Sequence, residues 1–107
     1  MRIIARRTLL DFAQACKGQA DHAAVTSALD AWFNEVRKAT WHSAADVRRS
    51  FATVSIIGAD RLVFNIKGND YRLVVAADYG RSIVWIKWIG RYGDYDHIDV
   101  RTVSHGN

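Results

Sequence analysis

Apolar residues recur at helical spacing through the first half of the chain. The most regular stretch covers residues 21–38, where one side of a helix would be apolar and the charged residues fall mostly elsewhere. Its apolar positions are Val25, Leu29, Trp32, Phe33 and Val36. Two shorter helices are predicted, one over about residues 9–18 and one that Ser43 would cap before Val47. Residues 2–5 suggest a short strand, and Thr8 and Asp11 have the spacing of a capping box.

After Phe51 the period changes to that of strands, and short turns separate four runs rich in β-branched residues. The runs are TVSII (53–57), RLVFNI (61–66), YRLVVAA (71–77) and SIVWIKWI (82–89). Consecutive strands joined by short turns predict an antiparallel meander. The whole chain, residues 1–107, is therefore predicted to be one α+β domain, in which an N-terminal strand and two to three helices pack on a four-stranded antiparallel sheet.

Two basic residues interrupt the apolar strands. Arg72 alternates onto the face opposite Tyr71 and Leu73, and Lys87 alternates with Trp88. Alternation assigns Val84, Ile86 and Trp88 to one face and Ile83, Trp85, Lys87 and Ile89 to the other. If the register brings Arg72 and Lys87 to one face, two cations can bind phosphate on the side of the sheet away from the helices. The alternative is that each is simply a solvent-facing strand residue.

Polar and aromatic residues cluster directly after Gly90, in the sequence RYGDYDH. Tyr92 and Tyr95 can stack on bases or donate hydrogen bonds. Asp96 and His97 can orient or move a proton near neutral pH, and Arg91 can contact a phosphate oxygen. Each also has a structural explanation: a packed ring for Tyr95, a helix cap for Asp96 and simple exposure for His97.

Composition narrows the class of partner. The formal net charge of +4 favours an acidic partner such as nucleic acid. The single cysteine, Cys16, excludes an intrachain disulfide and is predicted to be a buried thiol. The histidines are too widely spaced to suggest a metal site, and no cofactor is expected; they are His22, His42, His97 and His105. No segment has the length of a membrane span or a secretory signal, so a cytoplasmic protein without membrane association is expected.

Four segments together carry a family resemblance. They are MRIIARRTLLDF at the start, AWFNEVRKATWHSAADVRRSF at 31–51, VFNIKGNDYRLVV at 63–75 and IVWIKWIGRYGDYDHID at 83–99. With them the chain resembles the HigB toxins of type II toxin–antitoxin systems, within the RelE-like superfamily. The resemblance implies an mRNA interferase, which is a ribosome-dependent and metal-independent endoribonuclease that arrests translation. It also implies a cognate HigA-type antitoxin, with operator DNA bound only through the antitoxin complex.

The resemblance also suggests roles for individual residues. In such enzymes the ribose 2′-OH attacks the adjacent phosphate while basic side chains stabilise the added charge. The family typically has Gly-Thr-His after the last strand, whereas this chain has Gly90-Arg91-Tyr92, so either Tyr92 or His97 is expected to take the role of that histidine. The expected catalytic residues are Arg72, Lys87, Tyr92, Tyr95, Asp96 and His97, and the expected RNA-binding residues are Lys67, Arg81 and Arg91.

Two other functions fit the same residues. The chain can be a non-catalytic RNA- or ribosome-binding module of the same fold, in which case growth arrest would leave messages intact. It can instead act mainly in a DNA-binding complex with its antitoxin, in which case Arg72 or Lys87 would matter for repression and the effect would weaken sharply with salt.

Overall fold

A computed structural model describes residues 1–104, so His105 lies outside the described residues. The elements are, in chain order, β1 (Arg2–Ile4), α1 (Arg6–Ala15), α2 (His22–Lys38), α3 (Ala44–Ser50), β2 (Ser55–Ile57), β3 (Arg61–Ile66), β4 (Tyr71–Asp78), β5 (Ile83–Arg91) and α4 (Tyr92–Tyr95). The predicted α+β class is confirmed, and the short helix α4 is an element that the periodicity did not predict.

The sheet has five strands in the order β1-β5-β4-β3-β2, and it is mixed. The prediction of a four-stranded antiparallel sheet was wrong, because β1 pairs in parallel with β5, from Arg2 opposite Ile83 to Ile4 opposite Trp85. Without β1, the outer edge of β5 would leave its backbone N–H and C=O groups unpaired. The pairing joins segments about eighty residues apart, so local periodicity carries no signal for it.

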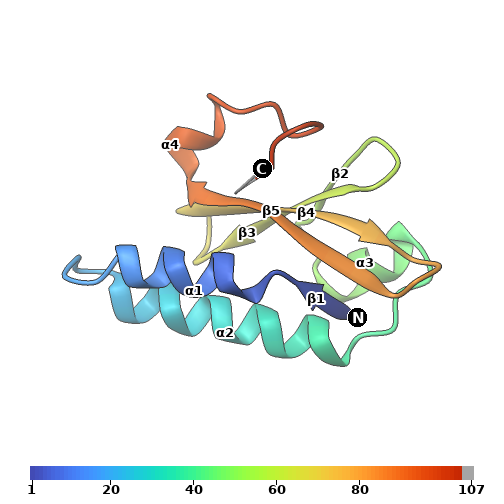
Figure 1. The fold of residues 1–107 in the computed structure, drawn as a ribbon, viewed down its shortest axis with the longest axis horizontal. Helices are drawn as coiled ribbons and strands as arrows, with labels where there is room; N and C mark the ends of the chain where they lie inside the picture. Colours follow the sequence, from blue (N-terminus) through green and yellow to red (C-terminus); the bar gives the residue numbers. More distant parts are fainter. Residues whose placement is uncertain (105–107) are drawn as a thin grey trace.

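The helices α1 and α2 lie together across one face of the sheet, while α4 and the C-terminal segment lie on the other (Figure 1). Tyr71, Leu73 and Val75 of β4 are fully buried in the core beneath the helices. Trp32 of α2 meets Phe64 of β3 edge-to-face at 5.4 Å between ring centres. The predicted assignment of these β4 residues to the helix side is confirmed.

The second face is covered in part by the C-terminal segment. Val63 and Val74 pair across β3 and β4 and are both buried, although they lie outside the core cluster under the helices. The guanidinium of Arg61 donates to the carbonyl oxygens of Val100 (3.3 Å) and Val103 (2.8 Å). These bonds hold the segment after α4 against the sheet. The end of the sheet near Arg72 is instead covered by α4.

One irregularity in β5 changes which side chains share a face. Val74 pairs with Trp88, but Val75 pairs with Ile86, so Lys87 is an extra residue without a partner in the register. Such a bulge breaks the alternation of a strand. Ile89 therefore joins Ile86 in the core, and Trp88 turns to the other face. The predicted faces of Trp88 and Ile89 were wrong for this reason.

The helix starts differ from the predicted caps. Thr8 lies inside α1, whose N-cap is Ala5, so the predicted capping box at Thr8 and Asp11 was wrong. Asp11 instead forms an exposed ion pair with Arg7 at 3.1 Å, one helical turn earlier. Ser43 does occupy the N-cap position of α3, but its side chain makes no capping hydrogen bond.

Cys16 and the lengths of the helices bear on two further predictions. Cys16 is buried at the end of α1, which confirms the prediction for it. Among residues 1–104, no helix is both long and apolar enough to cross a bilayer.

Candidate functional site

Arg72 lies under α4 with its charge uncompensated. The carbon atom of its guanidinium lies 4.5 Å from the ring centre of Tyr92 and 6.0 Å from that of Tyr95. The same group donates hydrogen bonds to the carbonyl oxygens of Asn69 (3.1 Å) and Tyr71 (3.4 Å). Across residues 1–104 no carboxylate pairs with Arg72. The two rings and the two carbonyls thus hold a cation in place while leaving its charge for an anionic ligand.

Backbone hydrogen bonding brings Tyr92 to Arg72. Arg72 pairs with Gly90, two residues before Tyr92. The backbone N–H of Tyr92 donates to the carbonyl oxygen of Asp70 at 3.0 Å, which fastens the start of α4 to the β3–β4 turn. Tyr92 as a residue is 50% exposed, so it is accessible to a ligand.

An aromatic floor lies beside Arg72, and the sequence pattern did not predict it. The ring centres of Trp88 and Tyr95 lie 6.4 Å apart. A Cβ atom at Gly90 would overlap the outer ring atoms of Trp88, so only glycine lets this ring lie across the strand. The signal in the sequence is a glycine two positions after a tryptophan on one strand face. We call Arg72, Trp88, Tyr92 and Tyr95 the cation–aromatic cluster.

Lys87 lies farther along β5. It is half-buried at the bulge and forms no ion pair within the described part of the chain. The register places it between two and three positions from Arg72, which is roughly 8 Å along the strand direction. That separation suits contacts with neighbouring oxygens or phosphates of one nucleic-acid strand.

Asp96 and His97 directly follow α4, and both are exposed. The backbone N–H of His97 donates to the carbonyl oxygen of Asp94 at 3.1 Å, which closes a turn after the helix. Neither side chain contacts Arg72. Both therefore lie next to the cation–aromatic cluster along the chain, without being part of it.

Lys67 lies in the β3–β4 turn and is already paired. Its ammonium group lies 2.7 Å from a carboxylate oxygen of Asp70, and this hydrogen bond raises the pKa of Lys67. The backbone of Lys67 is left-handed (φ 52°), as is that of Gly68 (φ 65°), which gives the turn its shape. The ion pair fixes the turn that supports Tyr92.

Arg81 and Arg91, two of the residues expected to bind RNA, lie away from the cluster. Arg81 is exposed in the β4–β5 turn and pairs with Asp78 at 3.6 Å, at the opposite end of the hairpin from Arg72. The six residue steps along β4 from Arg72 to Asp78 correspond to roughly 20 Å. Arg91 alternates onto the helix side of the sheet, where its guanidinium lies 5.0 Å from the ring centre of Tyr71.

Arg91 belongs to a network behind the cluster. The hydroxyl of Tyr71, whose side chain is fully buried, donates to Asp21 at 2.5 Å. Burial, with this hydrogen bond, raises the pKa of Tyr71 to about 12, and the same bond is the main cause of a lowered pKa at Asp21. Arg91 lies 3.7 Å from Asp21 and donates to Gln19. The network ties the α1–α2 loop to the strand positions next to Arg72 and Tyr92.

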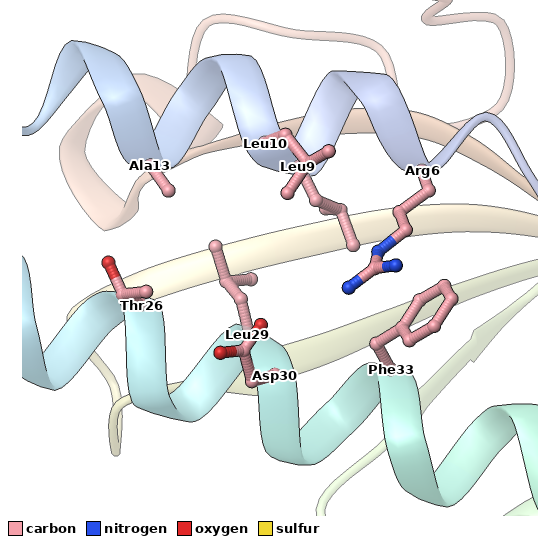
Figure 2. Close-up of a pocket in the computed structure, with 8 residues that line it drawn as sticks. All are labelled: Arg6, Leu9, Leu10, Ala13, Thr26, Leu29, Asp30 and Phe33. Carbon is pink, nitrogen blue, oxygen red and sulfur yellow. The ribbon is translucent and has the colours of Figure 1, made fainter.

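A separate hollow lies between α1 and α2, on the helix layer (Figure 2). Its walls are mostly apolar, and the guanidinium of Arg6 lies 4.2 Å from the ring centre of Phe33 within it. The lining residues are Arg6, Leu9, Leu10, Ala13, Thr26, Leu29, Asp30 and Phe33. The sheet separates this hollow from the cation–aromatic cluster. Among residues 1–104, no group of three or more His, Cys, Asp or Glu side chains is placed to hold a metal ion.

A protein-family model matches residues 25–98, more than half of the chain. The matched region contains strands β2 to β5, α4 and the whole cation–aromatic cluster. Comparison with curated proteins finds no significant match. The matched family is HigB_toxin, described as the RelE-like toxic component of a toxin–antitoxin system, and the predicted resemblance is thereby confirmed. The chain therefore belongs to the HigB toxin family, whose members are RelE-like toxic components of toxin–antitoxin systems.

Proposed function

We propose that this protein is a ribosome-dependent mRNA endonuclease that arrests translation in the cytoplasm and is neutralised by a cognate HigA-type antitoxin. The observation that carries the proposal is the uncompensated guanidinium of Arg72, held between the rings of Tyr92 and Tyr95. An arginine without a carboxylate partner binds phosphate, and exposed aromatic rings beside it stack on unpaired bases. Because the family consists of toxic components, we infer that binding of RNA at this site harms the cell.

The proposed reaction is an internal transfer at one phosphate. The ribose 2′-oxygen forms a bond to phosphorus, the bond from phosphorus to the 5′-oxygen breaks, and the products are a 2′,3′-cyclic phosphate and a 5′-hydroxyl. Arg72 stabilises the negative charge that develops on the non-bridging oxygens, and Lys87 holds an adjacent oxygen or phosphate. One proton leaves the 2′-hydroxyl, and one is delivered to the departing 5′-oxygen.

Tyr92 is the better placed of the two candidates for proton transfer. Its ring packs against the guanidinium of Arg72 and the residue is 50% exposed, so a phosphate bound to Arg72 would lie next to Tyr92. His97 lies beyond α4 and has no contact with Arg72. We assign proton transfer to Tyr92 and stacking of the base to Tyr95 and Trp88, and we give Lys67, whose ammonium group is paired with Asp70, no direct part in the reaction.

Sequencing of RNA 5′ ends after induction tests the proposal. Arg72→Ala should reduce new 5′-hydroxyl ends in translated messages on the order of 10²–10³-fold, the usual effect of removing one transition-state donor. Arg48→Ala is the matched control, because Arg48 is an exposed cation on α3, which lies far from α4 (Figure 1). Identical end profiles for wild type and Arg72→Ala would refute the role of Arg72. Growth arrest with intact messages would instead establish the non-catalytic binding module.

Two further variants separate the candidate proton carriers. Tyr92→Phe removes the hydroxyl but keeps the ring against Arg72, so it should abolish cleavage without loss of RNA binding. His97→Ala should keep most of the activity. The reverse outcome would transfer the role to His97, and full activity in both variants would exclude both.

A further inference from the structure

The outer edge of β3 is only half covered. The short strand β2 pairs with the first half of β3, from Ile57 opposite Arg61 to Ser55 opposite Val63. Before Ser55 the chain turns away, and the backbone N–H of Val54 donates to Phe51 instead. β3 continues to Ile66, and among residues 1–104 no strand pairs with this second half on the side away from β4.

The hydrogen-bonding pattern identifies which backbone groups are left at this edge. The N–H of Ala77 donates to the carbonyl of Asp60 at 2.8 Å, which makes Arg61 and Ala76 a non-hydrogen-bonded pair. The pattern repeats every two residues, so Asn65 opposite Arg72 is also such a pair. The N–H and C=O of Asn65 therefore point away from β4, and neither has a backbone partner in the described chain. Such groups accept an added strand.

A groove runs between this edge and α2, and we call it the β3 groove. Its volume is about 480 Å³ including the open mouth, and its lining residues are Ala28, Ala31, Trp32, Glu35, Phe51, Asn65, Ile66 and Lys67. Trp32 is 3% exposed, and its indole N–H is buried without an acceptor among residues 1–104. The small side chains of Ala28 and Ala31 leave room beside it for an apolar group.

An extended peptide fits these features better than nucleic acid does. A strand placed beside Asn65 supplies both a C=O and an N–H to its backbone, and its alternate side chains enter the groove. The carboxylate of Glu35 on the α2 wall repels a phosphate backbone but tolerates a neutral peptide side chain, and the ammonium group of Lys67 in the same lining is already paired with Asp70. The partner that membership of the family implies is an antitoxin.

We propose that the cognate antitoxin adds an extended segment to the free edge of β3 at Asn65. The segment has an apolar–acidic–apolar pattern: the apolar residues enter the β3 groove, and the acidic residue lies on the face that carries Arg72. An added strand lies roughly 10 Å from β4, two strand spacings away, which an extended arginine and an extended glutamate can bridge. This inference rests on the proposed function, since the acidic side chain would neutralise the cation that binds the RNA phosphate.

Amide hydrogen exchange, followed by NMR on the labelled toxin with and without the antitoxin encoded beside it, tests the edge directly. The neighbours Phe64 and Ile66 direct their N–H groups into the β4 ladder and serve as internal controls. The amide of Asn65 should exchange much faster than theirs in the free toxin and at least tenfold more slowly once the antitoxin is bound. An unchanged Asn65 amide in the complex would overturn the proposal. Protection that grows with the concentration of toxin alone would also overturn it, because the occupant would then be a second copy.

Two variants of one residue give an independent test. Asn65→Pro and Asn65→Ala both lose the side-chain amide, but only proline loses the outward N–H, and proline is tolerated at a strand edge. In titrations without RNA, the proline variant should bind the antitoxin at least tenfold more weakly than the alanine variant. Ala31→Tyr, which fills the groove, should bind at least tenfold more weakly than Ala23→Tyr on the exposed part of α2. Equal affinities within both pairs would refute the docking surface.

These measurements are separable from the proposed enzyme activity. Antitoxin binding is read without RNA, so a toxin that fails to cleave messages would disprove the endonuclease and still report on the edge of β3. Thermal unfolding shows whether each variant is folded. If Asn65→Pro is unfolded, the exchange experiment on the wild-type chain decides.

Discussion

Replacement of Gly90 by alanine is the sharpest single test of the cation–aromatic cluster. The new Cβ would lie within 3.0 Å of two atoms of the Trp88 ring, a separation that real Cβ atoms essentially never show. The two nearest ring atoms lie 2.4 Å from the new Cβ, and packed carbon atoms sit about 3.5–4.0 Å apart, so the ring would have to retreat by at least roughly 1 Å. The φ angle of Gly90 is not left-handed, so the effect is steric and not conformational.

The expected loss of stability in Gly90→Ala depends on what the displaced Trp88 ring would push against. Trp88 packs beside Tyr95, and Tyr95 flanks Arg72, so a displaced indole disturbs one of the two rings beside the cation. Inserting a methyl group into packed surroundings costs about 1–3 kcal/mol. For a domain of this size, that corresponds to a decrease in Tm on the order of 5–15 °C.

Urea unfolding and the mapping of RNA ends measure the two consequences. Gly93→Ala is the matched control, because a Cβ at Gly93 meets nothing within 4 Å. The control should stay within about 1 kcal/mol of wild type, since alanine replaces glycine in an open helical position. Gly90→Ala should be less stable and cleave at least tenfold more slowly. If the two variants are equally stable and equally active, the packing of Trp88 across Gly90 is irrelevant to the site.

Three further variants probe the network behind the cluster and the turn beside it. Tyr71→Phe, which removes the hydrogen bond to Asp21, should lower the free energy of unfolding by about 1–2 kcal/mol in urea at pH 7. Because folding raises the pKa of Tyr71 from 10.0 to about 12, the difference between wild type and this variant should persist to pH 10 and shrink as pH rises towards 12; a constant difference would contradict the assignment. Folding lowers the pKa of Asp21, so wild type should lose stability as pH falls below 3.8, and Asp21→Asn, compared by acid unfolding, should lack that part of the loss. Gly68→Ala places a side chain at φ 65° and should cost about 1 kcal/mol in urea, whereas equal stability to Gly93→Ala would show that the turn relaxes.

Local periodicity predicted the fold where each element is specified by its own residues. The strand over residues 61–66 has the predicted bounds, and β4 extends the predicted run by one residue. The apolar stripe of α2 is buried at Val25, Leu29, Trp32 and Val36 as predicted. The parallel pairing of β1 depends on the free edge of β5, which exists only after the sheet has formed. No window of sequence contains that information.

The candidate site shows the same division. Arg72, Tyr92 and Tyr95 were predicted to share one region, and the structure brings their side chains together. Arg91 was grouped with them because it precedes Tyr92 in sequence. Arg91 pairs with Tyr71 across the strands, so its side chain points to the helix side of the sheet and contacts Asp21 there. Consecutive residues of a strand point to opposite faces of the sheet, so neighbours in sequence can lie on different sides of it.

The bulge at Lys87 explains why the aromatic part of the site could not be predicted from alternation. With a regular β5, Trp88 would follow Val84 and Ile86 into the core, and Ile89 would face the other side. One extra residue exchanges these two positions, so the core keeps an aliphatic side chain and the face with Arg72 gains an indole. The exchange is compatible with Gly90 because a glycine there leaves space for the displaced ring. The bulge and the glycine thus act together: the bulge turns Trp88 to the face with Arg72, and the glycine leaves space for its ring, which lies tilted by 51° to the ring of Tyr95.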